Sequence, residues 1–153
     1  MSRLLATALS ALLFCGTPVR AEPVQPSSTA GLPQWEWSGA VAQASGMRID
    51  LVRADVTIVT STDDRLTVKI VAEGSAEDAS RVWINVSLKD GVQMLSDRYP
   101  ERSPWAILAE CLPPSDERGD YWIVTTKFRV VIAAPRGTRP AVTVMSGTVR
   151  DLR

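Results

Sequence analysis

The sequence contains no histidine, and only two of its 153 residues are cysteines. Without histidine the chain cannot build the Ser-His-Asp or Cys-His arrangements that activate a nucleophile, or a zinc site with imidazole ligands. Cys15 falls within a predicted export signal, so the exported domain keeps only Cys111 and forms no internal disulfide. The fold must therefore rest on its apolar core, and we expect the Cys111 thiol to be buried or packed in a loop.

Positive charge is not in excess either, because 17 Lys and Arg residues face 17 Asp and Glu residues. Loss of residues 1–21 would remove two arginines and no acid, which leaves the remaining domain slightly acidic. Nucleic-acid binding needs clustered basic side chains, so the sequence argues against nucleic acid as a partner. No motif in the chain indicates a cofactor, and we predict none.

No apolar run is long enough for a membrane-spanning helix, which needs about 20 residues. The longest, Leu4–Phe14, follows a short positively charged start and precedes the sequence Val-Arg-Ala at 19–21. This arrangement is typical of a cleaved export signal. We predict a signal peptide at 1–21 and export to the periplasm or the cell surface. A second interpretation makes Cys15 the acylated N-terminus of a membrane-anchored lipoprotein, although the bulky residue before it disfavours this.

Alternation of apolar and polar residues is abundant, and it is typical of strands with two unlike faces. The clearest alternating segments are Arg65–Glu73 and Tyr121–Ile132. Further strands are predicted at 35–41, 47–52, 56–60, 81–88, 92–96, 140–145 and from 148 onward. No segment longer than about six residues has helical periodicity. About nine short strands favour an all-β fold, either an antiparallel sandwich or a stacked, solenoid-like β architecture.

The chain length fits one domain, which we place at 35–153. Residues 22–34 contain three prolines and are predicted to be a flexible linker. Residues 99–120 contain four prolines and mixed charge, and they are predicted to be a long loop. The predicted core combines inward positions of several strands: Leu66, Val68, Ile70, Ile84, Val86, Phe128, Val130 and Ile132.

Several short motifs follow one another in a distinctive order. They are Trp37-Ser38-Gly39, Gly46-x-x-Ile49-x-Leu51, Val68-x-Ile70-x-Ala72, the hairpin Val82–Met94, Phe128-x-Val130-x-Ile132-x-Ala134-Pro135-x-Gly137 and Val142-x-Val144-x-Ser146-Gly147-x-Val149. This order resembles the bacterial exported "putative adhesin" β-repeat family, a domain of unknown function. The resemblance implies a β-rich fold with stacked short strands and implies no functional residues. The sequence stops at Arg153, where such a stack would begin, so it resembles a short or truncated member.

Five tryptophans are the best candidates for ligand contact, since an exposed indole stacks on sugar rings. We name Trp35, Trp37 and Trp105 as possible contacts, although packing in the core and at strand edges is the favoured explanation for the tryptophans. The adjacent acids Asp63-Asp64 are typical of a solvated turn, and the Arg-Gly-Asp tripeptide at 118–120 arises easily by chance. We predict no catalytic residue and no metal site.

The sequence therefore favours an exported, non-enzymatic, adhesin-like β-module that acts by surface contact or as a structural protein of the cell envelope. Its partner is unknown, with an envelope protein, a surface protein or a glycan as the candidates. Two alternatives remain: a carbohydrate-binding module that uses exposed tryptophan, and a small enzyme that acts on glycans with two carboxylates.

The predicted cleavage after Ala21 has a direct test. Intact-mass measurement of the exported protein should give a chain that begins at or near Glu22. A mass that includes residues 15–21 together with acyl chains would establish the lipoprotein interpretation instead.

Overall fold

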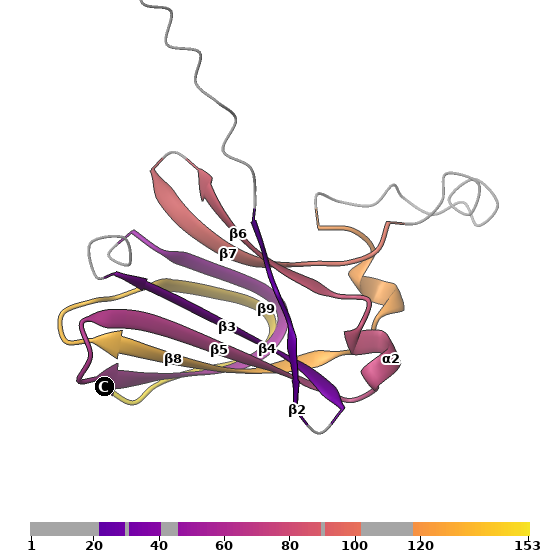
Figure 1. Cartoon of the computed structure of the whole chain (residues 1–153), viewed down its shortest axis with the longest axis horizontal. Helices are drawn as coiled ribbons and strands as arrows, with labels where there is room; N and C mark the ends of the chain where they lie inside the picture. The colour runs from indigo at the N-terminus through magenta and orange to yellow at the C-terminus, as the bar shows by residue number, and fades with distance from the viewer. Residues whose placement is uncertain (1–21, 30, 41–45, 90, 102–117) are drawn as a thin grey trace, which may run out of the picture.

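The computed structural model describes residues 22–29, 31–40, 46–89, 91–101 and 118–153 (Figure 1). Strands dominate this part of the chain, and the predicted all-β class is confirmed. The strands are β1 (Glu22–Val24), β2 (Ser27–Thr29), β3 (Leu32–Ala40), β4 (Arg48–Ser61), β5 (Arg65–Glu73), β6 (Trp83–Lys89), β7 (Val92–Arg98), β8 (Lys127–Pro135) and β9 (Ala141–Asp151). Short helical turns are α2 (Ala76–Ala79) and η1 (Tyr121–Ile123).

The strands form one sheet in the order β1-β6-β7-β4-β8-β5-β3-β2, with β9 paired to β4 beside this path. Pairing is antiparallel in both flanks of the sheet, as the sequence predicted. At its centre β4 pairs in parallel with β7, β8 and β9, so the sheet is mixed. Side-chain alternation reports which faces are buried and not the direction of a neighbouring strand, which explains the difference.

The long strand β4 joins the two flanks. Strand β9 runs along one edge of β4 from Arg48 to Ile58. The other edge pairs first with β7, at Arg48–Asp50, and then with β8, at Ala54–Ser61. Since a strand has only two edges, β7 and β8 follow one another along the same edge. The sheet therefore divides there, and Figure 1 shows β6 and β7 diverging from β5 and β8 while β4 and β9 curve.

Residues 22–29, which we call the strap, link the two ends of the sheet. Strand β1 pairs with β6 and β2 pairs with β3, and β6 and β3 lie at opposite ends of the strand order. The flexible linker predicted at 22–34 is thus corrected, because it holds β1, β2 and the start of β3. Edge strands tolerate proline, and the free backbone groups of both edges supply hydrogen bonds to the short strands.

Two boundaries differ from the sequence prediction. The strands expected at 47–52 and 56–60 are one strand, β4, and those expected at 140–145 and from 148 are one strand, β9. Gly147 has φ 134°, a conformation open to glycine, so β9 continues through a residue at which the sequence predicted a break.

The strand predicted at Tyr121–Ile132 begins later than expected, because η1 occupies its start and β8 covers Lys127–Pro135. The Arg53 guanidinium donates hydrogen bonds to the backbone carbonyls of Tyr121 and Val124. This contact holds the backbone before β8 in a non-strand conformation, and no local pattern encodes a partner 68 residues away.

The core is the one that the alternation predicted. Seven of the eight predicted positions are at most 1% exposed, whereas Val86 is half-buried at the edge of the core. The ring of Trp35 meets Phe128 edge-on, with ring centres 5.8 Å apart and planes at 84°. Offset or edge-on contacts of this kind add to the stabilisation from buried area.

Val130 and Val131 provide a matched test of the core, because these neighbours in β8 are 0% and 38% exposed. Val130→Ala should lower the free energy of unfolding by about 2–3 kcal/mol, through lost burial and the cavity left behind. Val131→Ala should lower it by less than about 1 kcal/mol. Equal losses in a denaturant titration would contradict the assignment of faces.

Candidate functional site

The structure places the predicted ligand contacts Trp35 and Trp37 on the same face of β3, two residues apart. The strap crosses this face, and the two indoles line different cavities on either side of it. Trp35 is buried in the core, whereas Trp37 is only half-buried. Trp105 lies outside the described residues. The role of these three residues in ligand contact stays a prediction.

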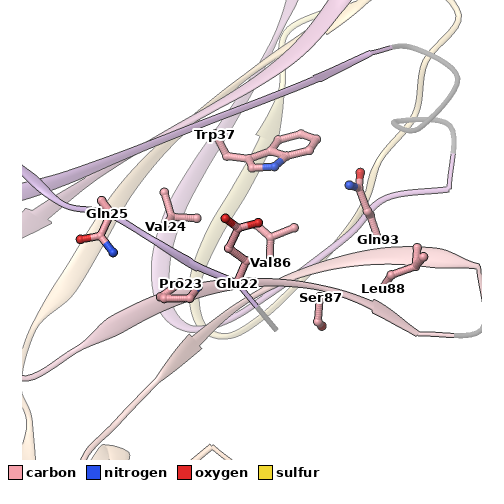
Figure 2. A pocket seen from close by; sticks show the side chains of 9 residues that line it. All are labelled: Glu22, Pro23, Val24, Gln25, Trp37, Val86, Ser87, Leu88 and Gln93. Carbon is pink, nitrogen blue, oxygen red and sulfur yellow. The ribbon is translucent and has the colours of Figure 1, made fainter. Parts of the chain in front are cut away.

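We call the cavity beside Trp37 the seam cavity; its volume is about 440 Å³. Its walls come from four segments: strap residues 22–25, Trp37 of β3, residues 86–88 of β6 and Gln93 of β7. Figure 2 shows Trp37 above the strap, with the side chains of Glu22, Val86 and Gln93 on the same side of β6 and β7 as the indole. The seam cavity thus exists only where the strap meets the two flanks of the sheet.

Gly39 fixes the position of the Trp37 ring. A Cβ added at Gly39 would lie 2.2 Å from Trp37 Cη2 and 2.5 Å from Trp37 Cζ2, far inside van der Waals contact. The missing side chain therefore leaves the space that the benzene ring of Trp37 occupies. The Trp37-Ser38-Gly39 motif, which is part of the family resemblance, therefore has a local structural reason. The missing side chain of Gly39 makes room for the ring of Trp37.

Polar groups of the seam cavity are mostly hydrogen-bond acceptors or amides. Gln93 Oε1 is buried and has no hydrogen-bond partner among the described residues. Glu22 supplies a carboxylate, and Gln25 and Ser87 add an amide and a hydroxyl. None of the described lining residues is basic. A carbonyl without a partner costs free energy, so a hydrogen-bond donor that reached the amide of Gln93 from the cavity would stabilise it.

Sequence reasoning missed both Gln93 and Glu22. Gln93 lies in a strand and resembles any polar residue of an alternating pattern, and Glu22 was assigned to the linker. Neither position carries a motif. Only the pairing of β1 with β6 brings Glu22 beside residues that lie more than 60 positions further along the chain.

A second cavity, of about 550 Å³, lies on the other side of the strap. Trp35 and Val82 contribute buried walls, and Pro26, Pro33 and the half-exposed Trp83 contribute apolar ones. No acid or base lines it within the described residues, and none of its described side chains is an orphaned polar group. Its polar lining consists of the amide of Gln25 and the hydroxyls of Ser27 and Ser80, so it lacks the buried group without a partner that distinguishes the seam cavity.

The described residues do not assemble an enzymatic carboxylate pair in these cavities. Glu22 is the one acid that lines the seam cavity, and Asp63 is the one acid of a third cavity of about 340 Å³ beside Arg136. Glycoside hydrolysis uses two carboxyl groups about 5–9.5 Å apart on opposite sides of the scissile bond. Asp63 instead belongs to an exposed turn, where its N–H donates to Ser61 Oγ at 3.0 Å.

The Arg-Gly-Asp tripeptide is not displayed as a surface ligand. Gly119 and Asp120 are buried, and Tyr99 N donates to Arg118 O at 2.8 Å while Asp120 N donates to Pro100 O at 3.0 Å. These two bonds join the ends of the predicted loop at 99–120. Within the described residues, no group of three His, Cys, Asp or Glu side chains is placed to hold a metal ion.

Asp97 is a fully buried acid, and its contacts are with backbone and side-chain groups of the fold. Its Oδ2 accepts hydrogen bonds from Val52 N at 2.9 Å and from the Tyr99 hydroxyl at 2.8 Å. Burial raises the pKa of Asp97 above its ordinary value of 3.8, against the hydrogen bonds and the nearby positive charge of Arg118, which lower it. Asp97 lines none of the three cavities, so we assign it a role in stabilising the fold.

Comparisons with known proteins assign neither a family nor a function. No known protein family matches the sequence, and no curated protein matches it significantly. One solved structure, described as a putative cell adhesion protein from Clostridium sporogenes, is similar with a TM-score of 0.37 and 10% sequence identity. The match covers 78% of this chain and 47% of the other, so the chain spans about half of that protein's length.

The described part of the chain contains no helix of the length and hydrophobicity needed to cross a membrane.

Asp97→Asn should make stability less dependent on pH. The folded-state pKa of Asp97 is raised, so the protonated carboxyl contributes to the stability of the fold. This contribution is fully present below pH 3.8 and is lost as pH rises through the folded-state pKa. The amide of the variant cannot ionise, yet its oxygen still accepts from Val52 and Tyr99. As pH rises above about 4, the free energy of unfolding of Asp97→Asn should therefore increase relative to that of the wild type.

The control is Asp63→Asn, which removes an exposed acid. A pH series of urea titrations measures all three proteins. A constant difference between Asp97→Asn and the wild type from pH 3 to pH 8 would show that Asp97 is not titrating in the fold.

Proposed function

We propose that the protein is an exported, non-enzymatic, adhesin-like β-module that acts by surface contact, and that the seam cavity is its binding site. Export rests on the signal-like sequence of residues 1–21. The observation that carries the binding site is Gln93 on the wall of a cavity that also holds the half-buried indole of Trp37. The Oε1 atom of Gln93 is buried and has no hydrogen-bond partner among the described residues.

A cavity of about 440 Å³ lies within the range of about 300–1,000 Å³ that is typical of small-molecule sites. Such sites combine aromatic contact with a few polar groups that orient the ligand, and the seam cavity has both. The absence of histidine from the sequence and the single acid among its described lining residues favour binding over catalysis.

Strand edges give the protein a second kind of contact surface. Strand β9 pairs with β4 alone among the described strands, and Met145 and Val149 on it are half-exposed. Such an edge accepts a strand from another molecule unless charged residues discourage pairing. Arg150 and Asp151 supply charge at its end. We therefore place ligand binding in the seam cavity and not along β9.

Co-sedimentation with isolated bacterial cell envelopes tests the proposal. The wild type should sediment with the envelopes, and Trp37→Ala should reduce bound protein at least tenfold. Trp122→Ala is the matched control, because Trp122 is 61% exposed and lines none of the three cavities. Equal retention of both variants would show that contact does not run through the seam cavity.

A further inference from the structure

We propose that the seam cavity binds a neutral pyranose sugar, with one face of the ring against Trp37 and a ring hydroxyl hydrogen-bonded to Gln93. This inference rests on the proposed function, because it names the ligand class of the same cavity. It depends on three features of the cavity: the aromatic wall, the amide of Gln93 and the small net charge of the lining.

The aromatic wall favours a flat ligand with apolar C–H groups on one face. Gly39 leaves room for the Trp37 ring to lie along β3, and Val24 and Val86 extend the apolar wall beside it. A pyranose ring presents axial C–H groups on one face and hydroxyls around its rim. Burying that face on an indole removes apolar area from water while the hydroxyls stay able to form hydrogen bonds.

The polar groups match the rim of such a ring. Gln93 Oε1 needs a donor, and the Glu22 carboxylate accepts hydrogen bonds only. Hydroxyls donate to both, and the same hydroxyls accept from the amide N–H groups of Gln25 and Gln93. A ligand of this class therefore satisfies the buried carbonyl without leaving another polar group unpaired.

Charge disfavours the main competitors. The predicted cleavage after Ala21 would leave an α-ammonium group on Glu22, which balances the carboxylate of the same residue, and no described lining side chain is basic. An anionic ligand, such as a phosphate or a uronate, would therefore gain no net attraction from the cavity wall. A quaternary ammonium is held by several aromatic rings around one charge, whereas Trp37 is the one aromatic residue of the described lining. A purely apolar ligand would leave Gln93 Oε1 without its hydrogen bond.

The position of the cavity predicts a second consequence. The strap supplies Glu22, Pro23, Val24 and Gln25 to one wall, and its pairing with β6 is only three residues long. A sugar that contacts both Glu22 and the Trp37–Gln93 side of the cavity joins the strap to β3 and β7. Binding should therefore slow hydrogen exchange of the backbone amides in the strap.

The probes are methyl β-D-glucopyranoside, cellobiose and N,N′-diacetylchitobiose, with choline and glucuronate as charged comparisons. Saturation-transfer NMR and calorimetry measure binding, and hydrogen-exchange mass spectrometry follows residues 22–29. We expect at least one neutral sugar to bind, with transfer strongest to the ring C–H protons and with slower exchange in the strap. Choline and glucuronate should not bind.

Three variants test the contacts. Trp37→Ala should abolish detectable binding, and Gln93→Leu should weaken it about tenfold through loss of one buried hydrogen bond. Gly39→Ala keeps the indole but forces it to move, and should weaken binding at least tenfold. Trp83→Ala, which alters the second cavity, is the control and should bind as the wild type does. Circular dichroism establishes that each variant folds.

The sugar assignment would be overturned if no neutral sugar bound at 50 mM or below, on the order of the weakest specific affinities. Binding of choline or glucuronate instead would also overturn it. So would unchanged sugar binding in both Gln93→Leu and Gly39→Ala. Envelope co-sedimentation that still depends on Trp37 would then show that the proposed function stands with another ligand class. Loss of both would remove the proposed function as well.

Discussion

The middle of β4 is the place on which the rest of this fold depends. Val52 lies between the stretch of β4 that pairs with β7 and the stretch that pairs with β8. Its N–H therefore has no strand carbonyl to meet on that edge, and the buried carboxyl of Asp97 accepts it instead. A side chain completes the backbone hydrogen bonding at the point where the sheet divides, which is how one strand serves two flanks.

Neighbouring residues of β4 extend this anchoring. Asp50 forms an ion pair with Arg118, and Arg53 binds the carbonyls of Tyr121 and Val124. The ring of Tyr121 also packs against Tyr99, with ring centres 6.2 Å apart. These contacts gather both ends of the 99–120 segment at the division of the sheet. A buried acid at such a point costs desolvation, which is acceptable because its hydrogen bonds replace those that the strands cannot make.

Division of the sheet also creates the gap between the flanks in which the seam cavity lies. Because β6 and β3 end the two flanks, each leaves a free edge, and free edges attract other strands. The strap covers both with two three-residue pairings and leaves a cavity on either side. Proline limits how far such a strap can pair, so the gap between the flanks is bridged without being filled. The candidate site is thus a consequence of how the fold protects its edges.

The fold class, most strands and the core follow from the order of the amino acids alone. Residues such as Val68, Ile70 and Phe128 alternate with polar neighbours, and alternation is a local property that survives whatever strand lies alongside. The sequence also showed Trp37 and Gly39 as a motif, although not why they stand together. The absence of histidine and of a second cysteine in the domain narrowed the possible chemistry through composition alone.

Which segments lie side by side depends on the folded chain as a whole. The parallel pairing of β4, the strand character of the strap and the non-strand start at Tyr121 all depend on partners far away in the sequence. The seam cavity is the clearest case, because Glu22, Trp37 and Gln93 come from three separate strands and none carries a local signal of the cavity. Pairing between distant segments is set by the total burial and hydrogen bonding of the folded chain, which no single stretch of residues contains.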